Sequence, residues 1–245
     1  MKRYCYILLL LCSAFLQADH VGLLVVATGR YIHFVEPLLQ SADRHFLPNQ
    51  DVTYFVFTDQ NIDFYDRVAR PIVRIEQQRL GWPYDTMMRL AMYHVHADAY
   101  EAVDYLYACD ADMLFVDTVG DEILGTLVAT QHPGFVGKRG SYETRPASNA
   151  YVAPHEGERY YAGGFNGGKK EAFLALAQTV AHNVEKDLDQ QIVAVWHDES
   201  HINRYFIDNV PDVMLSPSYC YPESWQLPYH KRLLALDKNH SEMRA

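Results

Sequence analysis

The spacing of hydrophobic positions changes twice within the first part of the chain. Residues 21–27 are almost continuously apolar and end in a polar turn, which predicts a buried strand. Phe34, Leu38 and Ala42 then recur at helical spacing and predict a helix. The run DVTYFVFTD at 51–59 returns to a β-rich composition. A strand, a helix and a strand in this order predict an α/β fold with a parallel sheet.

Further helices and strands are predicted along the rest of the chain. A helix should begin near Pro83 and Asp85, because proline suits a first helical turn and aspartate suits a cap, and it should continue through MMRLAMYHVHA. The apolar stretch VDYLYAC follows, and MLFV comes after an acidic turn. Residues 134–157 are rich in turn formers, and the glycine-dense YYAGGFNGGKK after them is assigned no element. Helices are predicted from about residue 170 to 186 and over WHDESHINRYFIDNV, with VMLSP as a last strand.

The first eighteen residues have the shape of a secretory leader. A basic start is followed by about a dozen apolar residues and then by the small residue Ala18. The apolar stretch is shorter than the roughly 20 residues that a membrane span needs, so a short membrane anchor is the second interpretation. We therefore expect residues 1–18 to direct export or membrane association, and a cytoplasmic location is the alternative if this segment is not used as a leader.

Composition limits the domain organisation and the class of partner. The chain has 245 residues, 49% of them hydrophobic, and neither an internal repeat nor a clear linker, so residues 19–245 are predicted to form a single domain. Its 21 basic and 31 acidic residues give a formal charge of −10. This charge argues against nucleic acid as a partner, since phosphate neutralisation dominates that affinity. Only Cys109 and Cys220 lie outside the leader, so no disulfide framework is expected.

The most informative stretch is VDYLYACDADMLFVD, in which an apolar strand ends abruptly in Asp110, Ala111 and Asp112. Ligands of open α/β sheets bind beyond the carboxyl ends of the strands, so these carboxylates are expected at a binding crevice. Mg²⁺ and Mn²⁺ commonly take one or two protein carboxylates and complete their shell with water and phosphate oxygens. Asp110 and Asp112 are therefore candidate metal ligands, and a solvated turn is the alternative.

The stretch WHDESH at residues 196–201 allows a metal-binding interpretation. His197 and His201 are four residues apart and project from nearly the same side of a helix, so they could hold zinc in a metallohydrolase, with Asp198 beside them and Glu223 as a third ligand. The metalloprotease pattern, however, has glutamate directly after its first histidine. Here that position is Asp198, whose side chain is one methylene shorter.

The same stretch allows two other interpretations. A carboxylate at a helix start beside an aromatic ring, as Glu199 is beside Trp196, suits sugar chemistry, because the carboxylate can stabilise or attack an electron-poor anomeric carbon. Alternatively, the acids only favour the positive end of the helix and the histidines make ordinary hydrogen bonds. Periodicity alone does not choose between these two.

Several stretches together resemble glycosyltransferase family six, the group that contains the histo-blood-group A and B transferases and α1,3-galactosyltransferase. In chain order they are SADRHF, YFVFTDQ, VDYLYACDADMLFVDTVGDEIL, HPGFVG, RPASNAY, EGERYYAGGFNGG, AVWHDESHINRY, LSPSYC and DKNH. The resemblance implies a GT-A fold, with a Rossmann-like, mostly parallel sheet flanked by helices. It also implies a UDP-GalNAc or UDP-Gal donor, a divalent metal (Mn²⁺, with Mg²⁺ as the alternative), and transfer with retention of the α linkage.

By position, the resemblance gives roles to the residues singled out above. Asp110 and Asp112 would bind the metal that bridges the UDP diphosphate, and Glu199 would face the reacting sugar as a nucleophile or an ion-pair stabiliser. A C-terminal tail would close over the phosphates and exclude water. The donor-side set carried over is Ala27, Tyr31, Arg89, Asp110, Ala111, Asp112, Gly134, Ala162, Gly163, Gly164, Asp198, Lys238 and Arg244.

Selection of the two sugars follows from the same resemblance. Gly134, Ala162 and Gly164 fall where the family discriminates its donor, and their small size favours N-acetylgalactosamine over galactose. The acceptor-side set carried over is His132, Ser141, Trp196 and Glu199.

One stretch departs from the family pattern. In LSPSYCYPESW, Tyr221 and Pro222 replace an aromatic and acidic pair of the family, and Glu223 and Trp225 lie downstream. The resemblance implies a galactoside acceptor. The more specific expectation is a fucosylated galactoside. The leading hypothesis is a retaining, metal-dependent α1,3-N-acetylgalactosaminyl- or galactosyltransferase, and the alternatives are a zinc metallohydrolase and a non-catalytic nucleotide-sugar-binding protein.

Overall fold

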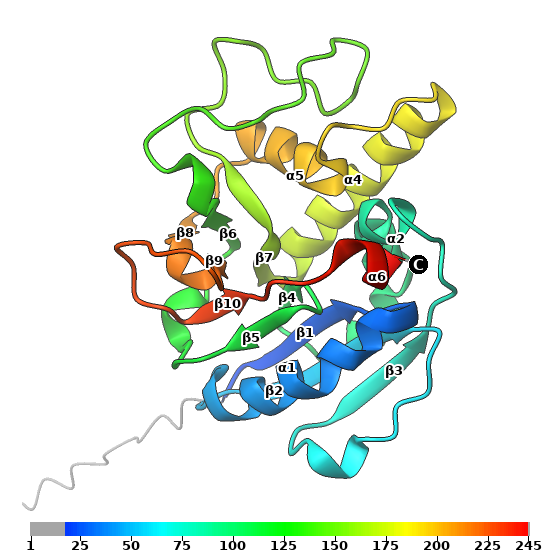
Figure 1. Cartoon of the computed structure of the whole chain (residues 1–245), viewed down its shortest axis with the longest axis vertical. Coiled ribbons are helices and arrows are strands. Elements are labelled where there is room, and N and C mark those ends of the chain that lie inside the picture. Colours follow the sequence, from blue (N-terminus) through cyan, green and yellow to red (C-terminus); the bar gives the residue numbers. More distant parts are fainter. Residues whose placement is uncertain (1–17, 245) are drawn as a thin grey trace, which may run out of the picture.

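In the computed structural model, which describes residues 18–244, a seven-stranded sheet forms the centre of the molecule in the order β3-β2-β1-β4-β7-β6-β8 (Figure 1). Strands β3, β2, β1 and β4 run parallel to one another, β7 is antiparallel to both β4 and β6, and β8 is parallel to β6. The predicted α/β class with a mostly parallel sheet is therefore confirmed. The strands of this sheet are β1 His20–Val26, β2 Asp51–Thr58, β3 Ile72–Glu76, β4 Tyr105–Cys109, β6 Leu127–Gln131, β7 Tyr161–Lys169 and β8 Val213–Leu215.

Helices cover both faces of the sheet. On one face α1, Ile32–His45, packs its apolar side against β1 and β2, as the spacing of Leu38 and Ala42 predicts. On the other face, α3 Arg89–Val95, α4 Lys170–Asp189 and α5 His197–Asp208 bury a second hydrophobic cluster. Figure 1 shows α1 in front of the sheet and the long α4 behind β7. Burial of these two apolar layers supplies the main driving force for folding.

The helix predicted near Pro83 is interrupted. Its first turn is α2, Tyr84–Met87, and α3 begins at Arg89, because Met88 leaves the helical region with ψ near 1°. Asp85 was expected to cap this helix; its carboxylate instead accepts hydrogen bonds from the backbone N–H groups of Leu80 and Gly81, at 2.8 and 2.9 Å. Arg89, the first residue of α3, donates a hydrogen bond to Asp110 at the carboxyl end of β4.

A second, three-stranded sheet lies in front of the first and corrects the prediction that VMLSP is the last strand. Its order is β5-β10-β9, with β5 Met113–Phe115, β9 Tyr221–Pro222 and β10 Leu233–Ala235. Because β10 pairs with β5, the chain that follows it passes the acidic turn, and the Leu236 N–H donates to the Asp112 carbonyl at 2.9 Å. The last helix, α6 His240–Arg244, then lies beside α2 (Figure 1).

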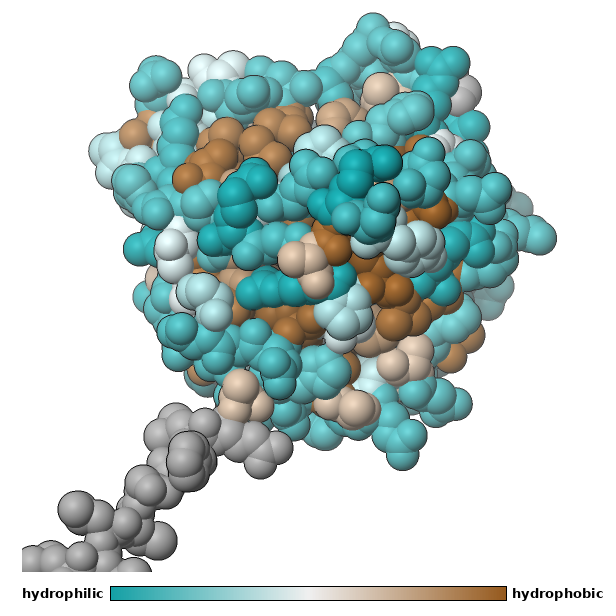
Figure 2. Space-filling model, turned by 90° about the horizontal axis from the view of Figure 1, so that it is seen from below, coloured by the Kyte–Doolittle hydropathy of each residue, from teal (hydrophilic) through white to brown (hydrophobic). Residues whose placement is uncertain are grey.

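The predicted leader, residues 1–18, lies outside the described part of the chain except for Ala18. Between residues 18 and 244, no helix is both long and apolar enough to cross a bilayer. Hydrophilic residues cover most of the face seen in Figure 2, with hydrophobic residues showing between them. Cys109 and Cys220 are free thiols.

Candidate active site

The acidic turn lies at the carboxyl end of β4, as the position of a ligand site in an open α/β sheet requires. Asp110 and Asp112 flank the buried Ala111 between β4 and β5. The Asp110 N–H donates to the Gly164 carbonyl at 2.9 Å, which ties the turn to the neighbouring strand β7. The side chain of Asp110 is 40% exposed and that of Asp112 is 10% exposed, so one carboxylate opens to solvent and the other lies deeper.

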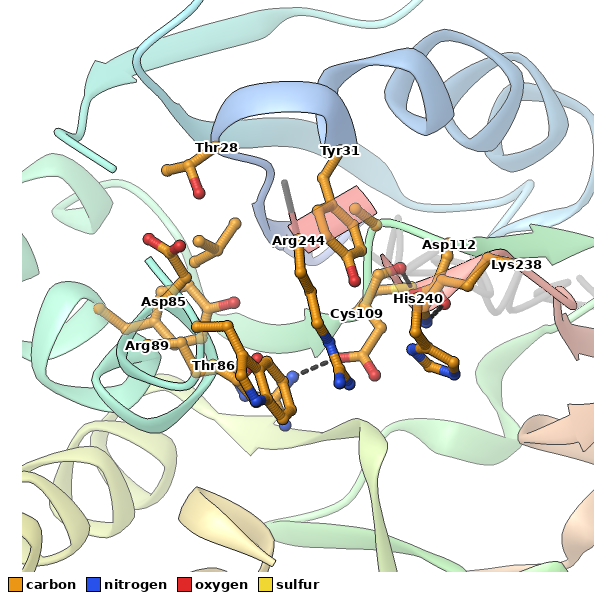
Figure 3. A pocket seen from close by; sticks show the side chains of 15 residues that line it. Thr28, Tyr31, Asp85, Thr86, Arg89, Cys109, Asp112, Lys238, His240 and Arg244 are labelled. Atoms are coloured by element: carbon orange, nitrogen blue, oxygen red, sulfur yellow. Dashed lines mark hydrogen bonds and ion pairs between the residues drawn. The ribbon is translucent and has the colours of Figure 1, made fainter. Parts of the chain in front are cut away.

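A cavity of about 220 Å³ opens in front of this turn (Figure 3). Its walls come from the end of β1, from α2 and α3, from the acidic turn and from the C-terminal segment. Seven of the predicted donor-side residues line it: Tyr31, Arg89, Asp110, Ala111, Asp112, Lys238 and Arg244. The cavity is smaller than the roughly 300–1,000 Å³ of ordinary ligand pockets, because the C-terminal segment fills part of the space.

Arg89 joins the parts of this site. Its Nε donates to Asp198 at 2.5 Å, its Nη1 donates to Asp110, and its Nη2 donates to the Gly163 carbonyl at 2.7 Å. Without the family resemblance, an arginine in this predicted helix is expected on the solvent-facing side. Arg89 is only 6% exposed. Its planar guanidinium therefore holds α3, the acidic turn, β7 and α5 in one arrangement.

Glu199 lies in the first turn of α5 and faces the start of β7. Its Oε2 accepts from the Gly163 N–H at 2.8 Å, and its Oε1 accepts from the Tyr160 hydroxyl at 2.8 Å. Burial raises the pKa of Glu199 to about 7, although both hydrogen bonds favour the ionised form. A carboxylate so held titrates near neutral pH, which is common among catalytic acids and bases.

Asp110 and Glu199 belong to one site. Gly163 contacts both Arg89, through its carbonyl, and Glu199, through its N–H. A side-chain carbon at the next residue, Gly164, would lie 3.3 Å from Oδ2 of Asp110. Adjacent glycines of β7 thus leave room beside both acids.

The C-terminal segment contributes the cationic wall. Lys238 donates to Asp112 and lies 5.7 Å from the centre of the Tyr31 ring. The guanidinium of Arg244 lies 3.4 Å from the centre of a Trp82 ring. Burial lowers the pKa of Lys238. The positive side chains of Lys238 and Arg244 therefore line the same cavity as Asp110 and Asp112.

Two of the predicted acceptor-side residues, Trp196 and Ser141, bond each other, and a third, His132, is connected to the fourth, Glu199, through Tyr160. Trp196, which is 49% exposed, donates from its indole Nε1 to the Ser141 hydroxyl at 2.8 Å. His132 accepts from the Gly134 N–H through Nδ1 at 3.0 Å, and its ring contacts the ring of Tyr160. Because Tyr160 also donates a hydrogen bond to Glu199, His132 is connected to the candidate catalytic acid through this tyrosine.

Some predicted residues lie elsewhere than expected. Ala27 is fully buried, with its N–H and carbonyl bonded to β2, and its neighbours Val26 and Thr28 line the cavity in its place. Asp198 is 1% exposed and sits behind Arg89, so it holds the arginine and is absent from the cavity wall. Burial raises its pKa to about 6 in spite of that arginine.

The donor-selecting positions are also separated. Ala162 is buried within β7. Gly134 lies beside His132 and Trp225, on the acceptor side: a side-chain carbon there would be 3.2 Å from His132 and 3.8 Å from Trp225. Gly164, beside Asp110, is therefore the one of the three with a contact to the acidic turn.

The four residues of the zinc interpretation have separate surroundings. The His197 ring packs on Trp82, with 4.8 Å between ring centres, and His201 lies 3.6 Å from Asp187. Glu223 accepts from the Asp237 N–H near the C-terminal segment. Within residues 18–244, no group of three or more His, Cys, Asp or Glu side chains could hold a metal ion by itself.

Sequence reasoning missed several residues of this site. Tyr160 is the most important of them, because it bonds Glu199; only its place at the start of the glycine-dense stretch pointed to it. The cavity wall also includes Thr28, Trp82, Asp85, Thr86 and His240. A single sequence carries no signal that separates these residues from ordinary loop positions.

A mostly parallel sheet with two aspartates at a strand end and Glu199 in the same site agrees with the class that comparison with known proteins shows, a glycosyltransferase. The chain belongs to glycosyltransferase family 6, whose model matches residues 5–245. It is 37% identical over 242 residues to histo-blood group ABO system transferase 1 of Rattus norvegicus, across 94% of this chain and 70% of that protein. It is 33% identical over 243 residues to globoside alpha-1,3-N-acetylgalactosaminyltransferase 1 of Homo sapiens, across 92% and 68%.

Proposed function

We propose that this glycosyltransferase moves N-acetylgalactosamine, or galactose, from a UDP-sugar in α1,3 linkage to a galactoside acceptor, with retention at the anomeric carbon and dependence on a divalent metal. The observation that carries the proposal is the connection of Asp110 to Glu199 through Arg89 and Gly163. This connection puts the acids needed for the leaving diphosphate and for the reacting sugar in one site. The alpha-1,3-N-acetylgalactosaminyl specificity in the name of the human relative supports the linkage and the donor.

The acidic turn suits Mn²⁺ or Mg²⁺. Asp110 and Asp112 offer carboxylate oxygens, which these hard cations prefer, and a cation bound there would compete with Lys238 for Asp112 and with Arg89 for Asp110. Two protein carboxylates are a usual number where a substrate diphosphate supplies further ligands. When bound, the metal supplies Lewis-acid stabilisation of charge on the departing diphosphate.

Glu199 is suited to stabilise the electron-poor anomeric carbon, either by covalent attack or by ion pairing. Its two oxygens are held by separate donors, so its orientation is fixed before the substrate binds. Retention of configuration requires a carboxylate on the face opposite the leaving group in the covalent route. Ionised Glu199 is the only acid that the start of β7 holds in this way among the described residues.

The C-terminal segment is suited to bind the diphosphate. Lys238 and Arg244 both line the cavity and bring positive charge to the place where the phosphates of UDP would lie. The ring of Tyr31 on the same wall offers an apolar face for the uracil base. By covering the cavity, this segment would also keep water from the activated donor.

The acceptor would bind between His132 and the Trp196–Ser141 pair. Burial lowers the pKa of His132 to about 4, and its Nδ1 accepts from Gly134, so the neutral ring carries its proton on Nε2. His132 would therefore donate a hydrogen bond to an acceptor oxygen. The half-exposed indole of Trp196 offers an apolar face for the sugar ring. We further propose that residues 1–18 direct the protein to the membrane or out of the cytosol.

The test supplies purified protein with UDP-GalNAc or UDP-Gal and a set of galactoside acceptors, some of them fucosylated, with and without Mn²⁺. An α1,3-linked product that forms only with metal is the expected result. Absence of transfer from both donors under every divalent metal would remove the proposal. Tight UDP binding without transfer would identify a non-catalytic binding protein instead.

A further inference from the structure

The carboxylate of Glu199 is held at both oxygens by groups from one short segment. The Gly163 N–H fixes Oε2 and the Tyr160 hydroxyl fixes Oε1, each at 2.8 Å. One hydrogen bond would leave the carboxylate free to rotate about its last side-chain bond. Two bonds on different oxygens set the plane of the group and thus the direction of its lone pairs.

The segment that carries both donors is itself locked to α5. The Asn203 Oδ1 accepts from the Tyr161 N–H, and the Asn203 Nδ2 donates to the Tyr161 carbonyl, both at 2.8 Å. The same amide nitrogen lies 2.9 Å from the Glu199 carbonyl, to which it also donates. Asn203 therefore sets the register between the start of β7 and the helix turn that bears Glu199.

The Tyr160 ring has almost no freedom of its own. It is 0% exposed and lies in edge-on contact with the rings of Phe135 and Tyr142, each with 5.0 Å between ring centres. A side-chain carbon at Gly140 would lie only 2.1 Å from this ring, so the loop passes directly over it. These contacts come from the β6–β7 loop, residues 132–160, which also carries His132 and Ser141.

We propose that Tyr160 is a positioning residue: its hydroxyl aims the Glu199 carboxylate at the reacting sugar, and the β6–β7 loop holds Tyr160 in place for this task. The proposal rests on the proposed function, in which Glu199 faces the sugar. Its consequence is that the acceptor-side residues and the catalytic carboxylate form one rigid assembly. Changes in that loop then alter turnover without touching the donor cavity.

The experiment compares Tyr160→Phe with the matched variant Tyr54→Phe. Tyr54 is also buried and also loses one hydroxyl hydrogen bond, but its hydroxyl donates to Asp43 of α1 and not to Glu199. Tyr160→Phe should lower kcat by about 10- to 100-fold, the range that a small misplacement of a catalytic group produces, with an unchanged dissociation constant for UDP and Mn²⁺. Tyr54→Phe should stay within about twofold of the wild type, since Tyr54 contacts neither Glu199 nor the β6–β7 loop.

A pH profile separates positioning from mere loss of stability. The Tyr160 hydroxyl favours ionised Glu199, and the other groups that act on this carboxylate are the Gly163 N–H, Asp198 and Arg89. The acidic limb of kcat should move to higher pH in Tyr160→Phe and stay in place in Tyr54→Phe. Replacing Tyr160 by 3-fluorotyrosine, a stronger donor of the same shape, should move the limb to lower pH, and this variant serves if the phenylalanine variant does not fold.

The outcomes distinguish the two proposals. If Glu199→Gln retains wild-type turnover, the proposed function of Glu199 is wrong. Two results would instead contradict the role of Tyr160 while Glu199→Gln is inactive and Glu199 keeps its role. One is that both tyrosine-to-phenylalanine variants have the same kcat and the same acidic pH limb. The other is that 3-fluorotyrosine at position 160 leaves this limb unmoved.

Discussion

Arg89 and Asp198 form an ion pair that is almost completely shielded from water. Their side chains are 7% and 2% exposed, and Nε lies 2.5 Å from Oδ2. Removing one partner of such a pair leaves the other charge buried without compensation, which is usually far more costly than the pair is stabilising. The pair therefore supports the site only as long as both members are present.

The first prediction follows from this pair. Arg89→Met should lower the free energy of unfolding by about 3–5 kcal/mol, because Asp198 is left buried and unpaired. Denaturant unfolding measures the change. Arg67→Met is the control, since its pair with Glu36 lies near the surface, with side chains 46% and 30% exposed, and should change stability by less than about 1 kcal/mol. Equal effects of the two variants would contradict the importance given to Arg89.

The second prediction concerns the pH dependence of stability. The pKa of Glu199 rises from 4.5 to about 7 on folding, so the folded state binds the proton more tightly and loses stability as pH rises between these values. Glu199→Gln carries no such group. Its stability relative to the wild type should therefore increase by about 1–3 kcal/mol from pH 4 to pH 8.

Unfolding at several pH values tests this expectation. The control Glu101→Gln, on an exposed turn, should follow the wild-type curve. A Glu199→Gln curve that runs parallel to the wild type would show that burial does not act on Glu199 as described.

The third prediction concerns metal binding without nucleotide. Lys238 donates to Asp112 and so competes with a cation for this carboxylate. Lys238→Met should tighten Mn²⁺ binding in the absence of UDP by about fivefold, the equivalent of about 1 kcal/mol. Titration followed by electron paramagnetic resonance gives the dissociation constant, and Lys186→Met on α4 is the control. Weaker Mn²⁺ binding by Lys238→Met would mean that the acidic turn is not the metal site.

The fourth prediction concerns the choice of donor. A methyl group at Gly164 would lie 3.3 Å from Oδ2 of Asp110 and 3.3 Å from the sulfur of Cys220, which narrows the site beside the acidic turn. Gly164→Ala should therefore lower kcat/KM for UDP-GalNAc by at least about tenfold relative to UDP-Gal, since the acetamido group is the larger substituent. The ratio of the kcat/KM values for UDP-GalNAc and UDP-Gal serves as an internal control, because a general loss of activity leaves this ratio unchanged. An unchanged ratio would remove Gly164 from donor selection.

Periodicity predicted the first strand, helix and strand because each buries one continuous apolar surface close to its neighbours in sequence. It failed for β7, because glycine has a low preference for strands. The structure gives the reason for these glycines. A side-chain carbon at Gly167 would lie 2.3 Å from the Leu106 carbonyl and 2.4 Å from the Tyr107 ring, so β4 and β7 approach closely only without one.

The site was predicted best where its residues follow a strand end. Asp110 and Asp112 could be placed in a crevice from the strand before them, and the resemblance to the family supplied Glu199. Arg89 gave no such signal, since its partners Asp110 and Asp198 lie 21 and 109 positions away. The hydrogen bond from Tyr160 to Glu199, 39 positions apart, was hidden for the same reason. Side-chain pairs of this kind are created by tertiary packing and leave no periodic pattern.

The span of the Arg89 contacts also bears on how the protein is made. A growing chain that has emerged only as far as α4 contains Arg89, Asp110 and Gly163 but lacks Asp198. Burying the guanidinium before Asp198, the more deeply buried of its two carboxylate partners, has been synthesised would cost more than it returns. We therefore expect this centre to close only after translation has reached α5, and a ribosome-bound fragment that stops at α4 should leave the cavity beside the acidic turn open.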